Sequence, residues 1–191
     1  MNKISGIKTL EYLGLQTVEL ISAQQLFSPT YVINQGISAR LSSKKDNSID
    51  VFLPSIHNCT SKIILKSFYE KYNSYYDVFF HETVVPVVIG TVSKYELLGQ
   101  KYFIIETYKD FVNRKNGIVE NRYIFNYFNV NTNYNSKLAK KIYGEVKNLP
   151  FESFDIEFVI EDGDVLYTDF YSNDFLKVDL LESVENSNKL Y

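Results

Sequence analysis

Cysteine and histidine are scarce in this sequence of 191 residues, which contains one cysteine and two histidines. Cys59 has no second cysteine with which it could form an internal disulfide. His57 and His81 are too few to build a histidine-based metal cluster. The sequence therefore excludes a disulfide-stabilised fold and a metal site made of cysteine or histidine ligands.

Long apolar runs and an excess of basic residues are also lacking. No apolar run approaches the ~20 residues that a membrane-spanning helix needs, and the opening Met-Asn-Lys-Ile-Ser-Gly has no apolar core of a signal peptide. The net charge of −3 and the pI near 5.5 argue against a nucleic-acid partner, because such proteins usually carry a basic excess. We therefore expect a cytoplasmic protein with no membrane partner.

Aromatic residues, in contrast, are abundant. The sequence has 16 tyrosines and 14 phenylalanines and is 45% hydrophobic, which is typical of a folded globular chain. Its length suffices for one domain with a real core, or for two small lobes that share an interface.

The spacing of apolar residues predicts three helices and a larger number of strands. The helices are expected over residues 3–13, ended by Gly14, over residues 60–73, begun by Thr60 or Ser61, and around Leu138, Ile142 and Val146. Strand-like runs cover residues 16–21, 31–34, 37–42, 49–53, 77–83, 87–94, 102–108 and 118–125, and a hairpin follows at 154–170. Because the strands follow one another instead of alternating strictly with helices, the predicted class is α+β with mostly antiparallel sheets.

Acidic residues interrupt the apolar runs of the hairpin at Asp155, Glu157 and Asp169. A three-residue turn over residues 162–164 would set Glu157 opposite Asp169, with Asp155 on the same side. A two-residue Asp-Gly turn would instead set Thr168 opposite Glu157. Two facing carboxylates repel each other unless a cation offsets their charge, and Mg²⁺ prefers oxygen ligands. In the first register, the hairpin predicts metal ligands at Glu157 and Asp169.

The same alternation has a simpler interpretation. Alternating polar and apolar residues are typical of any strand that is half exposed. In that case the acids face water and the apolar residues face the core, namely Phe154, Ile156, Phe158, Leu166 and Phe170. The pattern alone leaves both interpretations open.

The hairpin also resembles a known family. Asp155-Ile156-Glu157-Phe158, followed by Gly163 and by Leu166-Tyr167-Thr168-Asp169, is similar to the end of the ATP-grasp nucleotide-binding domain of phosphoenolpyruvate synthase and pyruvate phosphate dikinase. Other segments resemble that domain in the same order, so that the resemblance covers most of residues 3–170. It implies an ATP-grasp-like fold that binds ATP and Mg²⁺ as cofactors. Such a domain either transfers a phosphoryl group to a protein partner or a small substrate, as a phosphotransferase (kinase) or a ligase-like enzyme, or senses the nucleotide.

Two basic residues have phosphate-binding and catalytic roles in this resemblance. Ser5-Gly6-Ile7-Lys8 is similar to the family's opening Gly-Gly-Lys segment, which implies that Lys8 contacts a phosphate of ATP. Residues 37–43 are similar to the family's strand with an Arg-Ser-Ser sequence, which gives Arg40 the same role. A guanidinium group suits this role because its fixed fork binds two phosphate oxygens while it stays charged.

Two further segments imply contacts to the nucleotide. Residues 77–84, followed by Gly90-Thr91-Val92, resemble the strand and hinge whose backbone groups hold adenine. The resemblance thus assigns Phe80, His81, Glu82 and Val84 to the base. Residues 103–106 resemble the strand that leads into the family's Gly-Leu-Gly-Glu element, which adds Glu106 to the nucleotide-binding set.

Purely structural roles compete with these assignments. Lys8 on an opening helix is typical of a solvated charge. Arg40 in an apolar strand could form a buried ion pair with Glu106 or Glu157. His81 lies among aromatic residues, as core or edge histidines do.

The sequence departs from the family pattern in three places. Residues 44–49 contain no glycine where the family has a glycine-containing flap, residues 108–114 replace the Gly-Leu-Gly-Glu element, and Asp169-Phe170-Tyr171 replaces a Gln-x-Arg sequence. The second hypothesis is therefore a degenerate ATP-grasp-like module that serves as a protein-binding or assembly protein without catalysis. In either case we expect one compact unit over residues 1–171, with lobes at 1–75 and 76–171, and a C-terminal tail at 172–191.

Overall fold

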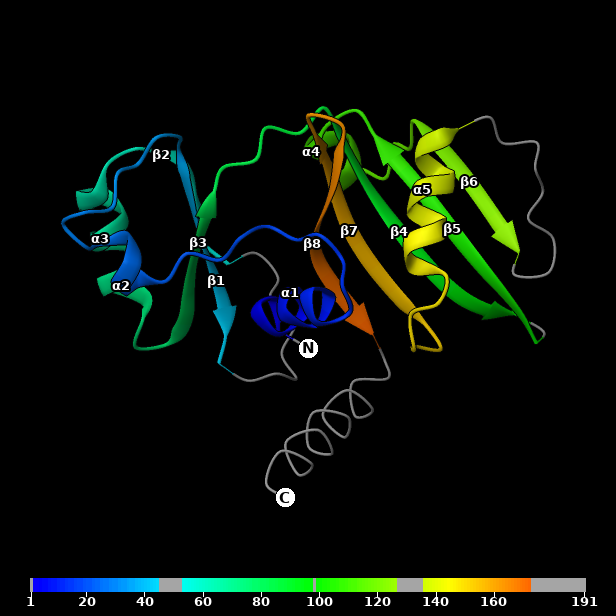
Figure 1. Cartoon of the computed structure of the whole chain (residues 1–191), viewed down its shortest axis with the longest axis horizontal. Helices are drawn as coiled ribbons and strands as arrows, with labels where there is room; N and C mark the ends of the chain where they lie inside the picture. The colour runs from blue at the N-terminus through cyan, green and yellow to red at the C-terminus, as the bar shows by residue number, and fades with distance from the viewer. Residues whose placement is uncertain (1, 45–52, 98, 127–135, 173–191) are drawn as a thin grey trace, which may run out of the picture.

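The computed structural model describes residues 2–44, 53–97, 99–126 and 136–172. These residues form two antiparallel sheets with helices packed against them (Figure 1), so the α+β prediction is confirmed. The two sheets stand side by side along the long axis of the molecule, with the first helix between their lower ends.

The three-stranded sheet contains β1 (Ile37–Ser43), β2 (Ile56–Cys59) and β3 (Tyr76–Glu82) in the order β2-β1-β3. Helices α2 (Ala23–Leu26) and α3 (Lys62–Tyr72) cover one face of this sheet. Leu26, Leu65 and Phe80 are fully buried in the core between the helices and the sheet. The other face is turned toward the five-stranded sheet.

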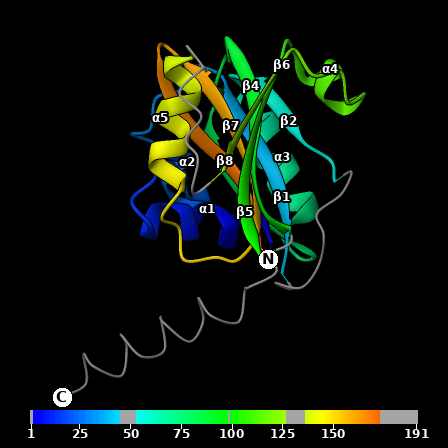
Figure 2. The same cartoon turned by 90° about the vertical axis from the view of Figure 1, so that its right-hand side faces the viewer.

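The five-stranded sheet has the strand order β6-β5-β4-β7-β8. Its strands are β4 (Val88–Leu97), β5 (Gln100–Tyr108), β6 (Asn121–Asn126), β7 (Phe154–Glu161) and β8 (Asp164–Ser172). Helix α5 (Lys137–Val146) covers one face and encloses the largest core cluster. Helix α4 (Phe111–Lys115) lies on the opposite side of the sheet, as Figure 2 shows.

Helix α1 (Lys3–Tyr12) joins the two sheets. Gly6 lies against the backbone of Phe170 on β8, where an added Cβ would come within 3.0 Å of the Phe170 carbonyl oxygen. On the side toward β3, Ile7 packs with Val18 and Phe79 in a separate buried cluster. Helix α1 is thus in contact with both sheets.

All three predicted helices are present. α1 is followed by Gly14 at φ +78°, α3 begins at Ser61, whose Oγ accepts a hydrogen bond from the Ile64 backbone N–H, and α5 buries Ile142 and Val146 as expected. In the described parts of the chain, no helix has the length and apolar character that a bilayer crossing requires.

Several strand predictions are wrong. Residues 16–21 form only isolated bridges, from Thr17 to Tyr167 and from Ile21 to Phe80, because this segment runs from one sheet to the other. Residues 31–34 form no strand, and the short elements α2 and β2 were not predicted. Of the run at 49–53, residues 49–52 lie outside the described residues, as do residues 173–191 of the tail.

The β7–β8 hairpin turns on two residues, Asp162 and Gly163, with φ of 51° and 90°. Both central residues thus have positive φ, as the type I′ turn of a two-residue hairpin requires. The three-residue turn was therefore the wrong expectation. Near the turn the core-facing residues of β8 are Val165 and Tyr167, whereas Leu166 points away from the main core.

A β-bulge in the same hairpin shifts the register once more. Phe158 pairs with Tyr167, but Glu157 pairs with Asp169, so that Thr168 is the extra residue on β8. The pairing of Glu157 with Asp169 is the one that the sequence predicted, although the bulge produces it and not the turn.

The sheets also bear on where lobes divide. β3 pairs with β1 over its whole length, so Tyr76–Glu82 belongs to the three-stranded sheet. The division into one unit over residues 1–171, with lobes at 1–75 and 76–171, and a tail remains a prediction.

Gly90 on β4 provides a test of the packing between β4, β5 and β7. A Cβ there would lie 2.1 Å from Cζ of Phe158 and 2.6 Å from the Glu106 carbonyl oxygen. Because a backbone atom is involved, we expect Gly90→Ala to lower the free energy of unfolding by about 2 kcal/mol or more. Chemical denaturation would measure this change.

Gly144 is the matched control. It lies exposed on α5, and nothing lies within 4 Å of an added Cβ. Gly144→Ala should therefore stabilise the protein by up to about 1 kcal/mol through higher helix propensity. Equal effects of the two substitutions would contradict the described packing.

Candidate functional site

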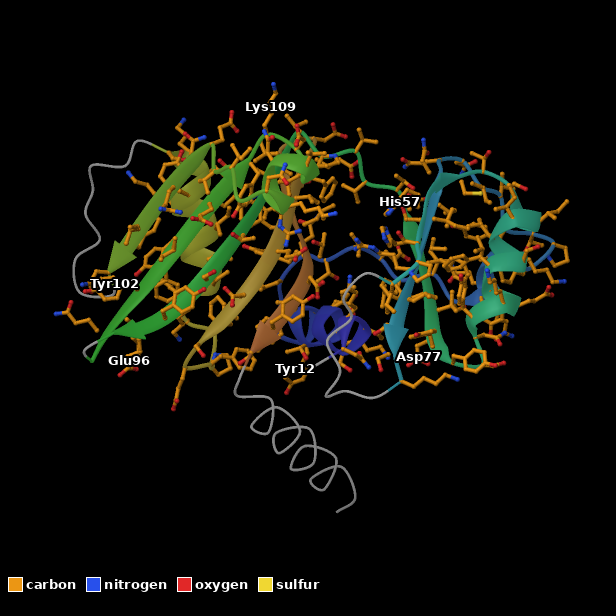
Figure 3. All side chains as sticks on the ribbon, turned by 180° about the vertical axis from the view of Figure 1, so that it is seen from behind. Tyr12, His57, Asp77, Glu96, Tyr102 and Lys109 are labelled. Carbon is orange, nitrogen blue, oxygen red and sulfur yellow. The ribbon has the colours of Figure 1, made fainter. Side chains whose placement is uncertain are left out.

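A cleft of about 160 Å³ lies between the two sheets. Its polar lining consists of Ser38, Arg40, His57, His81 and Thr83 on one side and Arg114, Glu157 and Thr168 on the other. Its apolar lining consists of Ile7, Val18, Phe79, Val84, Pro86, Phe111 and Val159. Figure 3 shows His57 on the three-stranded sheet, on the side that faces the five-stranded sheet. We call this space the cleft.

Strand β1 brings Arg40 to the cleft through its alternation. Ala39 packs into the core under α2 and α3, so its neighbours Ser38 and Arg40 point the other way, toward the cleft. Arg40 is half-buried. Within the described part of the chain, no carboxylate forms an ion pair with Arg40; Glu157 and Glu106 each have another arginine as partner. The buried ion pair that competed with a ligand role for Arg40 is therefore not formed with either residue.

A row of polar residues crosses the five-stranded sheet. Asp169, Glu157, Thr91, Glu106 and Arg122 are directly paired from β8 through β7, β4 and β5 to β6. The adjacent positions along these strands belong to the core beneath α5, namely Val92, Ile105, Ile156 and Phe170. The row therefore lies on the face opposite α5, and its β7 member lines the cleft.

Asp169 is the most buried carboxylate of this row, with 3% of its surface exposed. Burial and the neighbouring negative charge of Glu157 together raise the pKa of Asp169 to about 6, although the positive charge of Lys3 opposes the shift. Lys3 Nζ lies 3.8 Å from Asp169 Oδ2, and the Tyr171 hydroxyl donates a hydrogen bond of 2.8 Å to the same oxygen. The interpretation that all hairpin acids face water therefore fails for Asp169.

Glu157 has a different basic partner. It forms an ion pair with Arg114 of α4, and both side chains are about a quarter exposed. The two facing carboxylates are thus neutralised from two separate elements, Glu157 by α4 and Asp169 by α1. Asp155, which shares their side, is exposed and accepts a hydrogen bond of 3.0 Å from the Tyr95 hydroxyl.

The hinge after β3 contributes His81 and Val84 to the cleft. His81 is 8% exposed. Burial, together with the positive charge of Arg40, lowers the pKa of His81 to about 4, although the hydrogen bond to the Glu82 carbonyl oxygen raises this pKa. Its Nδ1 lies 2.7 Å from the Glu82 carbonyl oxygen. The ring is therefore neutral near pH 7, with Nδ1 as the donor to that oxygen.

Other predicted residues lie elsewhere. Phe80 is fully buried in the core of the three-stranded sheet, and its carbonyl oxygen accepts a hydrogen bond from the Ile21 N–H. Glu82 is exposed and accepts a hydrogen bond from Gln35. Lys8 is exposed and is not among the residues that line the cleft.

Glu106 also lies outside the cleft lining. Its carboxylate accepts hydrogen bonds from Arg122 Nε at 2.6 Å and from the Tyr108 hydroxyl at 2.7 Å. Glu106 is therefore two strands away from Glu157 along the polar row and already has its own cation.

Sequence reasoning missed Arg114, Lys3 and Thr168. Arg114 lies in the segment that departs from the family pattern, and its pairing with Glu157 spans 43 positions along the chain. Lys3 precedes the lysine that the resemblance selected, and the position of Thr168 depends on the bulge. The only sequence signal for the two ion pairs was that a basic residue lies on each of the helices α1 and α4, which pack near the hairpin.

The donor set fits a hard divalent cation. Glu157 and Asp169 face each other across β7 and β8 and supply carboxylate oxygens, which Mg²⁺ prefers. Among the residues that the structure describes, no group of three or more histidine, cysteine or acidic side chains gathers into a metal cage. A cation there would keep waters or ligand oxygens for its remaining positions, as Mg²⁺ commonly does.

Comparisons with known proteins bear on the fold. The sequence matches no protein-family model and no curated protein. Among solved structures, N5-carboxyaminoimidazole synthetase from Staphylococcus aureus is similar over 90% of this chain and 43% of its own, with a TM-score of 0.53 and 10% identity. That enzyme has the ATP-grasp fold.

The chain has the ATP-grasp fold.

Two further ATP-grasp structures are less similar. An L-amino acid ligase from Bacillus licheniformis has a TM-score of 0.46 at 11% identity, over 90% of this chain and 40% of its own. The macrocyclase MdnC bound with precursor peptide MdnA, from Microcystis aeruginosa MRC, has a TM-score of 0.42 at 12% identity, over 88% and 51%. This chain thus spans about half or less of each. The fold assignment depends on the S. aureus structure, and none of the three structures is a phosphoenolpyruvate synthase or a pyruvate phosphate dikinase.

The buried, neutral state of His81 predicts a pH-dependent stability. An unfolded histidine binds a proton near pH 6.5, whereas folded His81 does so only near pH 4. Between these values the unfolded state binds more protons, so stability falls as the pH falls. Relative to His81→Gln, we expect the wild-type protein to lose on the order of 3 kcal/mol between pH 6.5 and 4.

Urea denaturation across this pH range would measure the difference. His57→Gln is the control, because the His57 ring is exposed and should change the pH dependence less. If wild-type and His81→Gln proteins had parallel pH profiles, His81 would not be held neutral by burial.

Proposed function

We propose that this protein binds ATP with Mg²⁺ in the cleft and transfers the terminal phosphoryl group to an acceptor. The observation that carries the proposal is the arrangement across the cleft: Arg40 from the three-stranded sheet faces the wall that holds Glu157, whose strand partner is Asp169. An ATP-grasp fold with these charges at the junction of its two sheets is suited to a nucleotide and a divalent cation.

Arg40 is the proposed phosphate ligand. No described carboxylate forms an ion pair with it, and it shares the cleft with the neutral ring of His81. A guanidinium group held in this way binds phosphate oxygens through two parallel hydrogen bonds. Lys8 has this role only in the family resemblance, and its exposed position outside the cleft gives no support.

The hinge would hold the base. Val84 and Phe79 give the cleft apolar walls next to Thr83, and Val159 provides the opposite wall from β7. Apolar walls with a few backbone polar groups are typical of sites for planar ligands. Of the residues assigned by resemblance, Phe80 and Glu82 could contribute backbone groups only, because the Phe80 side chain is buried in another core and the Glu82 side chain is exposed.

Glu157 and Asp169 are the proposed Mg²⁺ ligands. When bound, Mg²⁺ neutralises the charge that develops on the transferred phosphoryl group. The protein's own contribution is to hold two carboxylates in register on neighbouring strands and to place Arg40 across the cleft from one of them, Glu157.

The acceptor is proposed to come from a protein partner or a small substrate. The S. aureus neighbour is named a synthetase, which agrees with chemistry that starts from ATP. The narrower relation to the nucleotide-binding domain of phosphoenolpyruvate synthase is supported by the order of the matching segments in the sequence, and it would favour a phosphorylated partner protein.

Calorimetric titration of ATP tests this function. We expect binding that requires Mg²⁺ and is lost in excess chelator. Arg40→Ala and Glu157→Ala should each weaken binding by tenfold or more, about 1.4 kcal/mol. Arg122→Ala is the control, because Arg122 forms an ion pair with Glu106 outside the cleft lining, and it should leave affinity within twofold.

Absence of Mg²⁺-dependent ATP binding by the wild-type protein at millimolar concentrations would refute the proposed function. In that case the ATP-grasp fold would be retained for binding a protein partner.

A further inference from the structure

The ion pair between Arg114 and Glu157 occupies the position that the proposed function gives to a metal ion. Glu157 is a proposed Mg²⁺ ligand, yet in this structure its carboxylate is bound by the guanidinium of Arg114. Both residues line the cleft. A cation can use this oxygen of Glu157 only if Arg114 leaves it.

Helix α4 can release Arg114 at little cost. The helix has five residues, from Phe111 to Lys115, and none of them is buried. It is capped by Asp110 at its start, and Gly117 follows its end at φ +68°. A shift of this turn, or of the Arg114 side chain alone, would therefore leave the apolar cores of both sheets intact.

A second arginine shows what a purely structural pair looks like on the same face. Arg122 pairs with Glu106 in the same polar row, at the far edge of the sheet, and more than half of its side chain is exposed. Neither residue lines the cleft. Arg114 differs because it extends from α4, on the same wall of the cleft, to Glu157, a carboxylate that both pairs with Asp169 and lines the cleft.

We propose that Arg114 is an exchangeable ionic latch on Glu157. In the nucleotide-free protein, Arg114 neutralises Glu157; when Mg²⁺ and ATP bind, Glu157 exchanges the guanidinium for the metal, and Arg114 turns to the phosphate oxygens across the cleft from Arg40. This role rests on the proposed function and adds to it a residue that the sequence comparison did not select.

The charges of the cleft favour an exchange of the Arg114 guanidinium for Mg²⁺ at Glu157 over a simple loss of the ion pair. Glu157 and Asp169 repel each other, so each needs a cation nearby in both states. Mg²⁺ satisfies that need at Glu157 once it is bound, and the released guanidinium then faces the negative charge of the triphosphate. Arg40 and Arg114 would approach the phosphates from opposite walls of the cleft. Either arginine alone would reach the phosphates from one wall only.

The latch predicts opposite effects on two ligands when Arg114 is replaced by methionine. Binding of Mn²⁺ alone, followed through the electron paramagnetic resonance signal of free Mn²⁺, should become at least fivefold tighter because no guanidinium competes for Glu157. Binding of ATP with Mg²⁺, followed by calorimetry, should become at least fivefold weaker. Arg122→Met should change neither affinity by more than twofold.

Arg114→Lys provides a second test that keeps the positive charge. Lysine lacks the planar fork, so both changes should have the same signs as in Arg114→Met and smaller sizes. If either variant weakens both ligands, Arg114 is a structural support and the latch is overturned. If the wild-type protein binds ATP with Mg²⁺ and the Arg114 variants do so equally well, the latch is overturned while the proposed function stands. If the wild-type protein binds neither ligand, both are overturned.

Discussion

The register of β7 and β8 is the constraint on which the cleft depends. Thr168 bulges out of the ladder, and the pairing that follows sets Asp169 directly opposite Glu157. Without the bulge, the two-residue turn would have placed Thr168 there and removed one carboxylate from the pair. One extra residue in a strand therefore decides whether the sheet presents a pair of facing carboxylates or a single acid. The β-bulge lies next to the candidate site, and β-bulges are often found beside active sites.

Two facing carboxylates are unfavourable by themselves, and the fold compensates for them with cations from outside the hairpin. Lys3 on α1 pairs with Asp169, and Arg114 on α4 pairs with Glu157. Helix α1 precedes the five-stranded sheet in the sequence, and α4 follows its second strand, β5. Because α1 also packs against β3 through Ile7, the same helix that neutralises Asp169 helps to hold the three-stranded sheet near the site. Electrostatics and packing thus act on the same junction, where Arg40 enters from β1.

Much of this arrangement could be predicted from the sequence, and the parts that could not share a physical reason. The helices and the hairpin acids follow from local periodicity, and the family resemblance selected Arg40, which the structure places in the cleft. Residues 16–21 alternate like a strand but form only isolated bridges to β8 and β3, because strand pairing is decided by tertiary structure. Leu166 was assigned to the core but lies outside it, because the two-residue turn sets the register of β8 and so decides which of its side chains face the core. The contact of Arg114 with Glu157 depends on how α4 crosses the sheet, which no local pattern encodes.

The central claim is that Glu157 and Asp169 together bind the metal ion of a nucleotide held by Arg40. Crystals of the protein soaked with ATP and Mn²⁺ would test it most directly through anomalous scattering at the manganese edge. The account predicts a single strong peak between the two carboxylates, with triphosphate density that reaches Arg40. A peak elsewhere, or nucleotide bound away from the cleft, would contradict it.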